Sequence, residues 1–243
     1  MSEIDFGALA PLAGEGDRAG RLRAAMNHGN RALVQATPAG LIGVMPALAL
    51  HLADGLGVPL ETADYHGARE IVESAGEDVW DVAFLAIDRS RETHIAYTRP
   101  YVVIEIAYAV RAGEAAEPEA LDRDGATILA ARGTAYDLHL TKTLTAAEIL
   151  RDTTPADTFR RFVAGEGDAV AGVRQSLEEA LGATPGIVIQ TAPVLSAEQA
   201  MVLPRARAAL LPALDAYVAA VKADGTVRRA LEASGQGGLR IPD

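Results

Sequence analysis

Arg91 and Asp88 carry the clearest indication of binding chemistry in this sequence. They follow residues 81–87, an apolar run after an aspartate that is typical of a strand buried in a parallel sheet. Asp88 is a good N-cap residue, so the pattern predicts a helix that begins there with Arg91 in its first turn. A cation opposes the helix dipole at that end, whereas backbone N–H groups stabilise an anion. The guanidinium and these N–H groups together predict a site for a carboxylate.

The composition limits what could occupy such a site. The formal net charge of −11 argues against partners that present many phosphates, so we expect no nucleic acid. Cysteine is absent, which excludes disulfides, thiolate nucleophiles and metal sites built on thiolates. The five histidines show no metal-ligand spacing, and no phosphate or dinucleotide loop follows a strand. We therefore expect neither a metal nor a cofactor.

The amino-terminal residues bear on localisation. Residues 1–5 contain no basic segment, and residues 6–13 are too short and too broken for the apolar core of a secretory signal. No apolar stretch approaches the roughly 18 residues that a membrane-spanning helix needs. As the sequence stands we expect a cytoplasmic protein without membrane insertion. If a signal peptide has been removed, we expect a periplasmic protein.

The elements that must position the site alternate along the chain. Apolar runs predict strands at residues 22–26, 58–63, 81–87, 101–110, 127–131, 147–150, 168–171, 186–190 and 199–203. Helices are predicted at residues 44–56, 67–74, 134–144, 155–164, 173–181, 206–222 and 226–233. A turn is expected at residues 99–101 and an acidic crossover loop at residues 111–124. This alternation predicts an α/β protein with mostly parallel sheets.

Several short motifs, taken together in order and spacing, resemble the family 3 solute-binding proteins of ABC importers, the polar amino acid type. The resemblance covers residues 20–233 and rests on stretches that stand for the family's glycine turn, helix end, T-x-x-R helix start, F-S/T-x-P-Y turn, G-T loop and second-lobe strand. In this chain they read Gly40-L-I-Gly43-V, Leu56-Gly57-Val58, Asp88-R-S-Arg91, Tyr97-Thr98-R-Pro100-Tyr101, Gly133-Thr134 and Gly165-E-Gly167-Asp168-A-V.

The resemblance implies a type 2 periplasmic binding protein fold of two lobes joined by two hinge strands. Lobe 1 would hold residues 20–107 and 196–243, lobe 2 residues 108–195, and residues 1–19 would be a lead-in. A small carboxylate or amino acid would bind between the lobes, which close on it by a hinge motion. We expect a monomer, with an ABC permease as its partner.

The same resemblance assigns candidate ligand-binding residues. Arg91 would bind the ligand carboxylate, and Thr134 would offer its hydroxyl at a helix N-terminus. Ala86 and Ile87 would supply backbone contacts, and the loop from Asn27 to Asn30 would line the side-chain pocket. Each also has an ordinary structural reading: Arg91 as an ion-pair partner, Thr134 as an N-cap, and the asparagines as turn formers.

Two departures from the family pattern affect the ligand. Asp88 stands where the family carries threonine, and it either caps the helix or competes with an incoming anion. Val173 stands where an acidic residue would take the ligand ammonium, and Arg174 follows it. An unpaired buried ammonium costs several kcal/mol. A carboxylate without an amine therefore fits the site as well as an amino acid does, and a dicarboxylate fits if Arg174 also faces the cleft.

Two alternatives remain beside the binding protein. Some relatives on this fold are dehydratases that aromatise cyclohexadienyl acids, which requires an acid or base above an anchored ring. Glu105, Asp88 and His28 are candidates for that role, but they form no convincing constellation, so an enzyme is the weaker expectation. The third reading is a cytoplasmic sensor or interaction protein.

Overall fold

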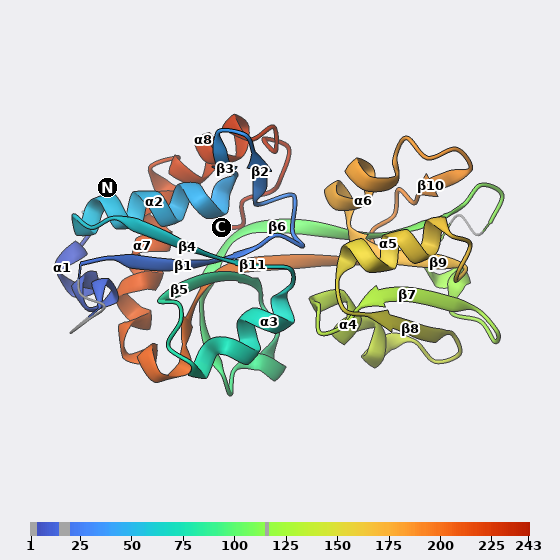
Figure 1. Cartoon of the computed structure of the whole chain (residues 1–243), viewed down its shortest axis with the longest axis horizontal. Helices are drawn as coiled ribbons and strands as arrows, with labels where there is room; N and C mark the ends of the chain where they lie inside the picture. Colours follow the sequence, from blue (N-terminus) through green and yellow to red (C-terminus); the bar gives the residue numbers. More distant parts are fainter. Residues whose placement is uncertain (1–3, 15–19, 115–116) are drawn as a thin grey trace. The chain divides into compact units, whose positions relative to one another are not determined.

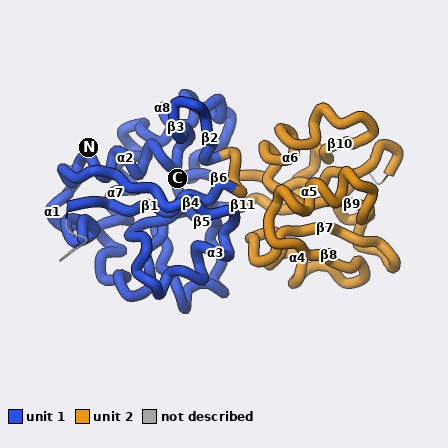
Figure 2. Tube along the Cα trace, in the orientation of Figure 1, with its two compact units in different colours: residues 1–28, 33–103, 198–243 blue, residues 29–32, 104–197 orange. Residues whose placement is uncertain are grey.

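Two compact units make up the chain in a computed structural model that describes residues 4–14, 20–114 and 117–243. Parts of the predicted lead-in (1–19) and of the predicted crossover loop (111–124) lie outside the described residues. Unit 1 comprises Met1–His28, Leu33–Val103 and Glu198–Asp243, and unit 2 comprises Gly29–Ala32 and Ile104–Ala197 (Figure 2). Two long strands, β6 (Ile95–Arg111) and β11 (Leu195–Pro204), each begin in one unit and end in the other.

The sheet of unit 1 has the strand order β4-β1-β5-β11-β6, formed by β4 (Leu60–Tyr65), β1 (Leu22–Asn27), β5 (Val82–Ala86) and the unit 1 parts of β11 and β6 (Figure 1). Strand β1 is parallel to both of its neighbours, β4 and β5, while β11 is antiparallel to β5. Because β1 and β5 run side by side in the same direction, their carboxyl ends share one edge of the sheet. This edge carries Asn27 and Ala86.

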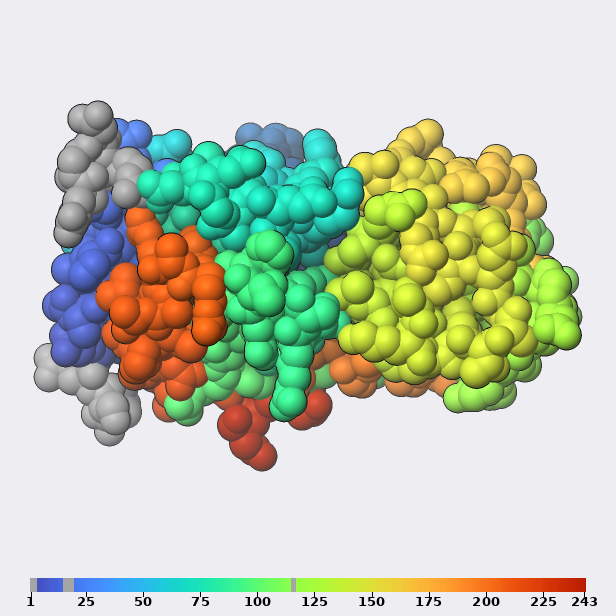
Figure 3. Space-filling view, turned by 90° about the horizontal axis from the view of Figure 1, so that it is seen from below, coloured from blue at the N-terminus to red at the C-terminus, as the bar shows by residue number. Residues whose placement is uncertain are grey.

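Helices cover this sheet, and short elements connect them. The α-helices of unit 1 are α1 (Phe6–Leu9), α2 (Val44–Leu56), α3 (Ala68–Glu73), α7 (Leu211–Ala223) and α8 (Thr226–Ala233). The short elements are η1 (Ala10–Ala13), the hairpin of β2 (Gln35–Thr37) and β3 (Gly40–Ile42), η3 (Ser74–Gly76), η4 (Arg89–Arg91) and η6 (Arg205–Leu210). On the face shown in Figure 3, the segment around residues 90–100 (green) lies beside η6 and α7 (orange), where the Arg205 N–H donates to His94 O over 2.8 Å.

The turn from β3 into α2 requires a glycine. Gly43 has a φ of +124°, and a Cβ at this position would lie 2.3 Å from the backbone oxygen of Leu33. An L-side chain is disfavoured at such a φ and would also collide with the neighbouring backbone. The predicted glycine turn therefore has a steric cause within unit 1.

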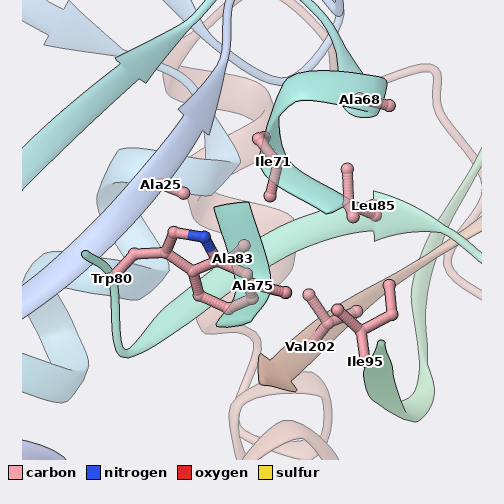
Figure 4. Close-up of a cluster of buried hydrophobic side chains, with 9 residues drawn as sticks. All are labelled: Ala25, Ala68, Ile71, Ala75, Trp80, Ala83, Leu85, Ile95 and Val202. Atoms are coloured by element: carbon pink, nitrogen blue, oxygen red, sulfur yellow. The ribbon is translucent and has the colours of Figure 1, made fainter. Parts of the chain in front are cut away.

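One apolar cluster of unit 1 fills the space between α3 and the sheet. The buried members are Ala25, Ala68, Ile71, Ala75, Trp80, Ala83, Leu85, Ile95 and Val202 (Figure 4). Trp80 is 1% exposed, and its indole N–H donates to Ser74 Oγ over 3.1 Å. A buried tryptophan needs such a partner, and Ser74 satisfies the indole N–H of Trp80 within the cluster.

The sheet of unit 2 has the strand order β6-β9-β7-β8, with β9 (Ala169–Val173), β7 (Thr127–Ala131), β8 (Glu148–Asp152) and, on the other side of β6, β10 (Ile187–Ile189). Strand β7 is parallel to β8 and β9, and β6 is antiparallel to β9. The helical elements are α4 (Ala135–Thr143), α5 (Pro155–Val163), α6 (Arg174–Leu181) and η5 (Pro118–Leu121). The unit has its own apolar cluster, which includes Phe159, Phe162 and Leu177.

Two predicted elements are corrected by the structure. The turn expected at residues 99–101 is wrong, because β6 continues through them. The Arg99 N–H has its partner outside the sheet, in the Asp215 carboxylate of α7. Pro100 has no N–H that would need a partner in the sheet. The extended chain therefore passes through both residues without ending the strand. The helix predicted at residues 206–222 is divided into η6 and α7. Pro212 lies in the first turn of α7 and cannot donate the bond that would continue the preceding helix.

Among the described residues, no helix combines the length and apolar character that crossing a bilayer requires.

Candidate functional site

The first group of candidate residues lies in unit 1, at the shared edge of β1 and β5. Ala86 is the last residue of β5, and the Ile87 N–H donates to Glu198 O over 2.9 Å. Asn27 is the last residue of β1 and is 9% exposed. The parallel pairing of β1 with β5 therefore brings Asn27, Ala86 and Ile87 to one edge of the same sheet.

The turn after β5 differs from the predicted helix. Arg91 ends the three-residue 3-10 turn η4, and no α-helix follows before β6. Asp88 is the N-cap as predicted, and its Oδ1 accepts from the Ser90 N–H over 2.8 Å. The N–H groups of Arg91 and Glu92 donate to Asp88 O and Arg89 O. These three N–H groups are bonded within the turn, so the expectation of free helix N–H groups beside Arg91 is wrong here.

The Arg91 side chain is buried at the end of β5. Its residue is 5% exposed, and Nη1 donates to Ala86 O over 3.2 Å. Tyr97, at the start of β6, donates its hydroxyl to Asp88 O over 3.3 Å. Burial raises the pKa of Tyr97, and the charge and a hydrogen bond of Arg91 oppose that rise. The Arg91 guanidinium and the Tyr97 phenol thus lie together beside residues 86–88.

His28 follows Asn27 in the loop after β1. Its backbone N–H donates to Tyr65 O over 2.9 Å, and Nε2 lies 2.8 Å from Asp64 Oδ1. This pair is partly exposed at the carboxyl end of β4. His28 is therefore engaged with a carboxylate of its own unit, an arrangement that holds the start of the loop that follows Asn27.

The second group of candidate residues lies in unit 2, where β7 and β9 run parallel and end at one edge. Thr134 is the N-cap of α4 and is 8% exposed. Its hydroxyl donates to Ala131 O over 2.8 Å and accepts from the Asp137 N–H over 3.2 Å. The Asp137 carboxylate in turn accepts from the Gly133 N–H and from Arg151 Nε, each over 2.8 Å. The helix start is held by this local network.

Arg174 begins α6, directly after β9. Its Nε donates to Glu105 Oε2 over 2.8 Å, Nη1 to Gln190 O over 2.9 Å and Nη2 to Thr191 O over 2.8 Å. The guanidinium therefore holds one strand and one loop of its own unit. A second carboxylate would have to share this guanidinium with three protein acceptors.

Asn30 belongs to the short segment Gly29–Ala32 of unit 2 and is 4% exposed. The neighbouring Arg31 donates its N–H to Ser176 Oγ over 3.3 Å and forms an ion pair with Glu179 of α6. This places Asn30 beside the first turns of the helix that Arg174 opens.

The structure thus gathers the candidates into two groups, one in each unit. Unit 1 holds Asn27, Ala86, Ile87, Asp88 and Arg91, and unit 2 holds Asn30, Thr134 and Arg174. Tyr97 was missed as a neighbour of Arg91, although its phenol in place of the family's phenylalanine was visible in the sequence. Within the described part of the chain, no group of histidine and acidic side chains could hold a metal ion.

The chain is similar to known proteins both in its sequence and in its fold. The family model of bacterial extracellular solute-binding proteins, family 3, matches residues 23–234. No curated protein gives a significant sequence match. A solved mutant of ArgBP from T. maritima, a protein also solved with arginine bound, superposes with a TM-score of 0.76 at 21% identity, covering 89% of this chain and 95% of that one.

Two further solved structures share the fold. An amino acid ABC transporter substrate-binding protein from Streptococcus pneumoniae, bound to L-arginine, has a TM-score of 0.75 at 20% identity and covers 92% of this chain and 96% of its own. The ancestral amino acid-binding protein AncCDT-1, described as a precursor of cyclohexadienyl dehydratase, has a TM-score of 0.73 at 20% identity, with coverages of 88% and 95%. These matches confirm the predicted type 2 periplasmic binding protein fold.

Proposed function

Because this chain belongs to the bacterial extracellular solute-binding proteins of family 3, we propose that it captures a small carboxylate or amino-acid-like metabolite between its two units. The observation that carries the proposal is Arg91, a buried guanidinium at the carboxyl end of β5. Ligands of open α/β sheets bind outside the carboxyl ends of the strands. A guanidinium there presents a planar set of donors that matches a carboxylate. Closure would occur by bending of β6 and β11.

In this proposal Arg91 binds the ligand carboxylate. Charge-assisted hydrogen bonds contribute about 1.5–3 kcal/mol each, so this contact would supply a large share of the roughly 8 kcal/mol that micromolar affinity requires. The Thr134 hydroxyl and the backbone at Ala86 and Ile87 add polar contacts. Asn27 and Asn30 line the pocket for the remainder of the ligand.

The contacts of Arg174 favour a structural role over a second carboxylate site, because its three donor nitrogens already reach protein acceptors. Val173 is apolar and 6% exposed. The proposed ligand class therefore includes monocarboxylates without an amine as well as amino acids. An ABC permease would be the partner that receives the ligand.

A thermal-shift and calorimetric screen tests the proposal. The panel contains L-arginine, L-lysine, L-glutamine, succinate and simple monocarboxylates. A ligand that binds the native state raises the melting temperature, and the rise grows with the logarithm of the ratio of its concentration to Kd. We expect at least one panel member to do so, and Arg91→Ala to lose the shift while keeping a cooperative transition.

Arg89→Ala is the matched control, because Arg89 lies in the same turn and is exposed. It should retain the shift of the native protein. Equal loss in both variants would indicate damage to the turn and would contradict a specific role for Arg91. No shift with any panel member would contradict the proposed function.

A second candidate function is a lyase that acts on cyclohexadienyl acids, favoured by the structural likeness to AncCDT-1. Against it, the three candidate acids or bases have structural contacts: Glu105 pairs with Arg174, Asp88 caps η4, and His28 pairs with Asp64. Incubating the protein with a cyclohexadienyl carboxylate and following aromatisation by ultraviolet absorption distinguishes the lyase from the binding protein. Turnover that disappears in His28→Ala, Asp88→Ala or Glu105→Ala would favour the enzyme.

A further inference from the structure

The phenol of Tyr97 lies against the same short segment as the Arg91 guanidinium. Arg91 Nη1 donates to Ala86 O, and the Tyr97 hydroxyl donates to Asp88 O. These two carbonyls flank Ile87, so the three-residue stretch 86–88, which begins with the last residue of β5, receives both side chains. Arg91 and Tyr97 are brought together because the chain reverses between η4 and β6, where the His94 N–H donates to Arg91 O over 2.9 Å.

The Tyr97 hydroxyl can act as an acceptor for Arg91. A phenol has one proton and two lone pairs, and the proton is directed to Asp88 O. A lone pair then remains for a guanidinium N–H. The hydrogen bond and the charge of Arg91 both act to lower the pKa of Tyr97, as expected for a guanidinium beside the phenol, while burial keeps it raised overall. The phenol is thus neutral at physiological pH, and it orients the guanidinium without adding a negative charge.

The aromatic ring of Tyr97 has a separate, structural task. It is half-buried and packs against the apolar cluster shown in Figure 4. A phenylalanine would fill this space equally well, as in the family motif that this stretch resembles. The hydroxyl is therefore the group that needs an explanation beyond packing.

We propose that Tyr97 is a positioning residue for Arg91: its hydroxyl, anchored on Asp88 O, holds the guanidinium in the orientation that receives a carboxylate. This inference rests on the proposed function, because it assigns the carboxylate contact to Arg91. It adds that the affinity for carboxylates depends on a neutral oxygen that does not itself touch the ligand.

Tyr97→Phe tests this inference, with Tyr65→Phe as the matched control. Tyr65 is also half-buried against the same cluster, but its hydroxyl accepts from Ser74 Oγ over 3.2 Å. Binding is measured by calorimetry for L-arginine, L-lysine, L-glutamine and succinate and for the corresponding amides. We expect Tyr97→Phe to weaken the carboxylates about tenfold and the amides less than about twofold, because the loss of one hydrogen bond to a charged group has about that effect. Tyr65→Phe should leave the ratio of the two affinities unchanged.

A second measurement needs no ligand. The Nε–H signal of Arg91 in a ¹H–¹⁵N spectrum is identified by its absence in Arg91→Lys. Tyr97→Phe should shift it and speed the rotation of the guanidinium, whereas Tyr65→Phe should not. An unchanged signal together with an unchanged carboxylate preference would overturn the inference and leave the proposed function standing. If the native protein bound no panel member, the proposed function and the carboxylate role of Tyr97 would both fall.

Discussion

Arg174 Nε lies 2.8 Å from Glu105 Oε2, and the same guanidinium reaches the backbone oxygens of Gln190 and Thr191. The antiparallel register of β6 with β9 sets this contact, because Ile106 pairs with Val173 and their neighbours Glu105 and Arg174 then lie opposite each other. Glu105 is in the unit 2 part of β6, and residues 190–191 lead toward β11. Within unit 2, the Arg174 side chain therefore holds Glu105 of β6 and the segment 190–191 that leads toward β11. Strands β6 and β11 are the two that both units share.

The two backbone contacts of Arg174 should matter more than its ion pair. The Glu105 side chain is 48% exposed, and exposed ion pairs contribute about 1 kcal/mol or less. Arg174→Lys loses the planar fork that reaches the two carbonyls and should lower the free energy of unfolding by about 1–3 kcal/mol. Glu105→Gln should cost less than about 1 kcal/mol. Urea denaturation of both variants provides the comparison, and a cost of Glu105→Gln equal to or larger than that of Arg174→Lys would contradict the greater weight of the backbone contacts.

Two buried tyrosines of unit 1 should respond oppositely to removal of the hydroxyl. Tyr101 Oη is buried and has no hydrogen-bond partner among the described residues, whereas Tyr217 Oη donates to Leu48 O and lies 3.1 Å from His51 Nδ1. Tyr101→Phe should leave the free energy of unfolding unchanged or raise it by up to about 1 kcal/mol. Tyr217→Phe should lower it by about 1–2 kcal/mol, since two partners lose a bond. Equal losses in chemical denaturation would mean that Tyr101 has an unseen partner.

Local patterns sufficed to predict most of the regular elements. The run of residues 44–56 with glycine after it gave the helix α2, which ends at Gly57 with φ of +68°. The hairpin of β2 and β3 was missed, because its three-residue strands are largely exposed and show no clear alternation. The sequence predicts only a lead-in where α1 and η1 lie, whereas Leu9 and Leu12 of this segment are buried. Its burial depends on α2 and α7, which are distant in sequence.

The candidate site could be predicted only in part for the same reason. Asp88 as an N-cap follows from its residue type and position. The length of η4 depends on how soon the chain must turn back into β6, and no local signal specifies that. The contact between Tyr97 and Asp88 arises from this reversal, and the contacts of Arg174 arise from the register of β6 with β9. Such tertiary relationships cannot be read from spacing alone.

Gly55 packs against Phe6, so Gly55→Ala should change the free energy of unfolding in opposite directions with and without Phe6→Ala. A Cβ at Gly55 would lie 2.0 Å from Phe6 Cε1, so Phe6 occupies the space that any side chain would need. Gly55→Ala should lower the free energy of unfolding by about 1–3 kcal/mol in the native background, because the ring must move. In a Phe6→Ala background it should raise it by up to about 1 kcal/mol through the higher helix propensity of alanine. Thermal denaturation of the four proteins measures the interaction, and the same sign in both backgrounds would contradict the packing argument.

Asp168 should make unit 2 sensitive to acid. Its Oδ2 accepts from the Thr127 N–H over 2.7 Å and from Thr127 Oγ1 over 3.0 Å, and the backbone bond is the main cause of its lowered pKa. A lowered pKa in the folded state means that the stabilisation is complete above the ordinary aspartate value of about 3.9. It is lost as the pH falls through the lower folded value.

Asp168→Asn should therefore melt below the native protein at neutral pH, and this difference should shrink as the pH falls below about 3.9. Asp54→Asn, at an exposed position of α2, is the control. Melting curves followed by circular dichroism between neutral and strongly acidic pH give the comparison. A difference that stays constant with pH would show that the charge of Asp168 is not what stabilises the strand start.

Trp80 is the single tryptophan of the sequence, and it is enclosed in unit 1. Intrinsic emission excited at the indole band therefore monitors that half of the molecule alone, while far-ultraviolet ellipticity samples both. Overlaying the two signals along one denaturant titration shows whether the halves melt as one cooperative body or in succession, without any added label.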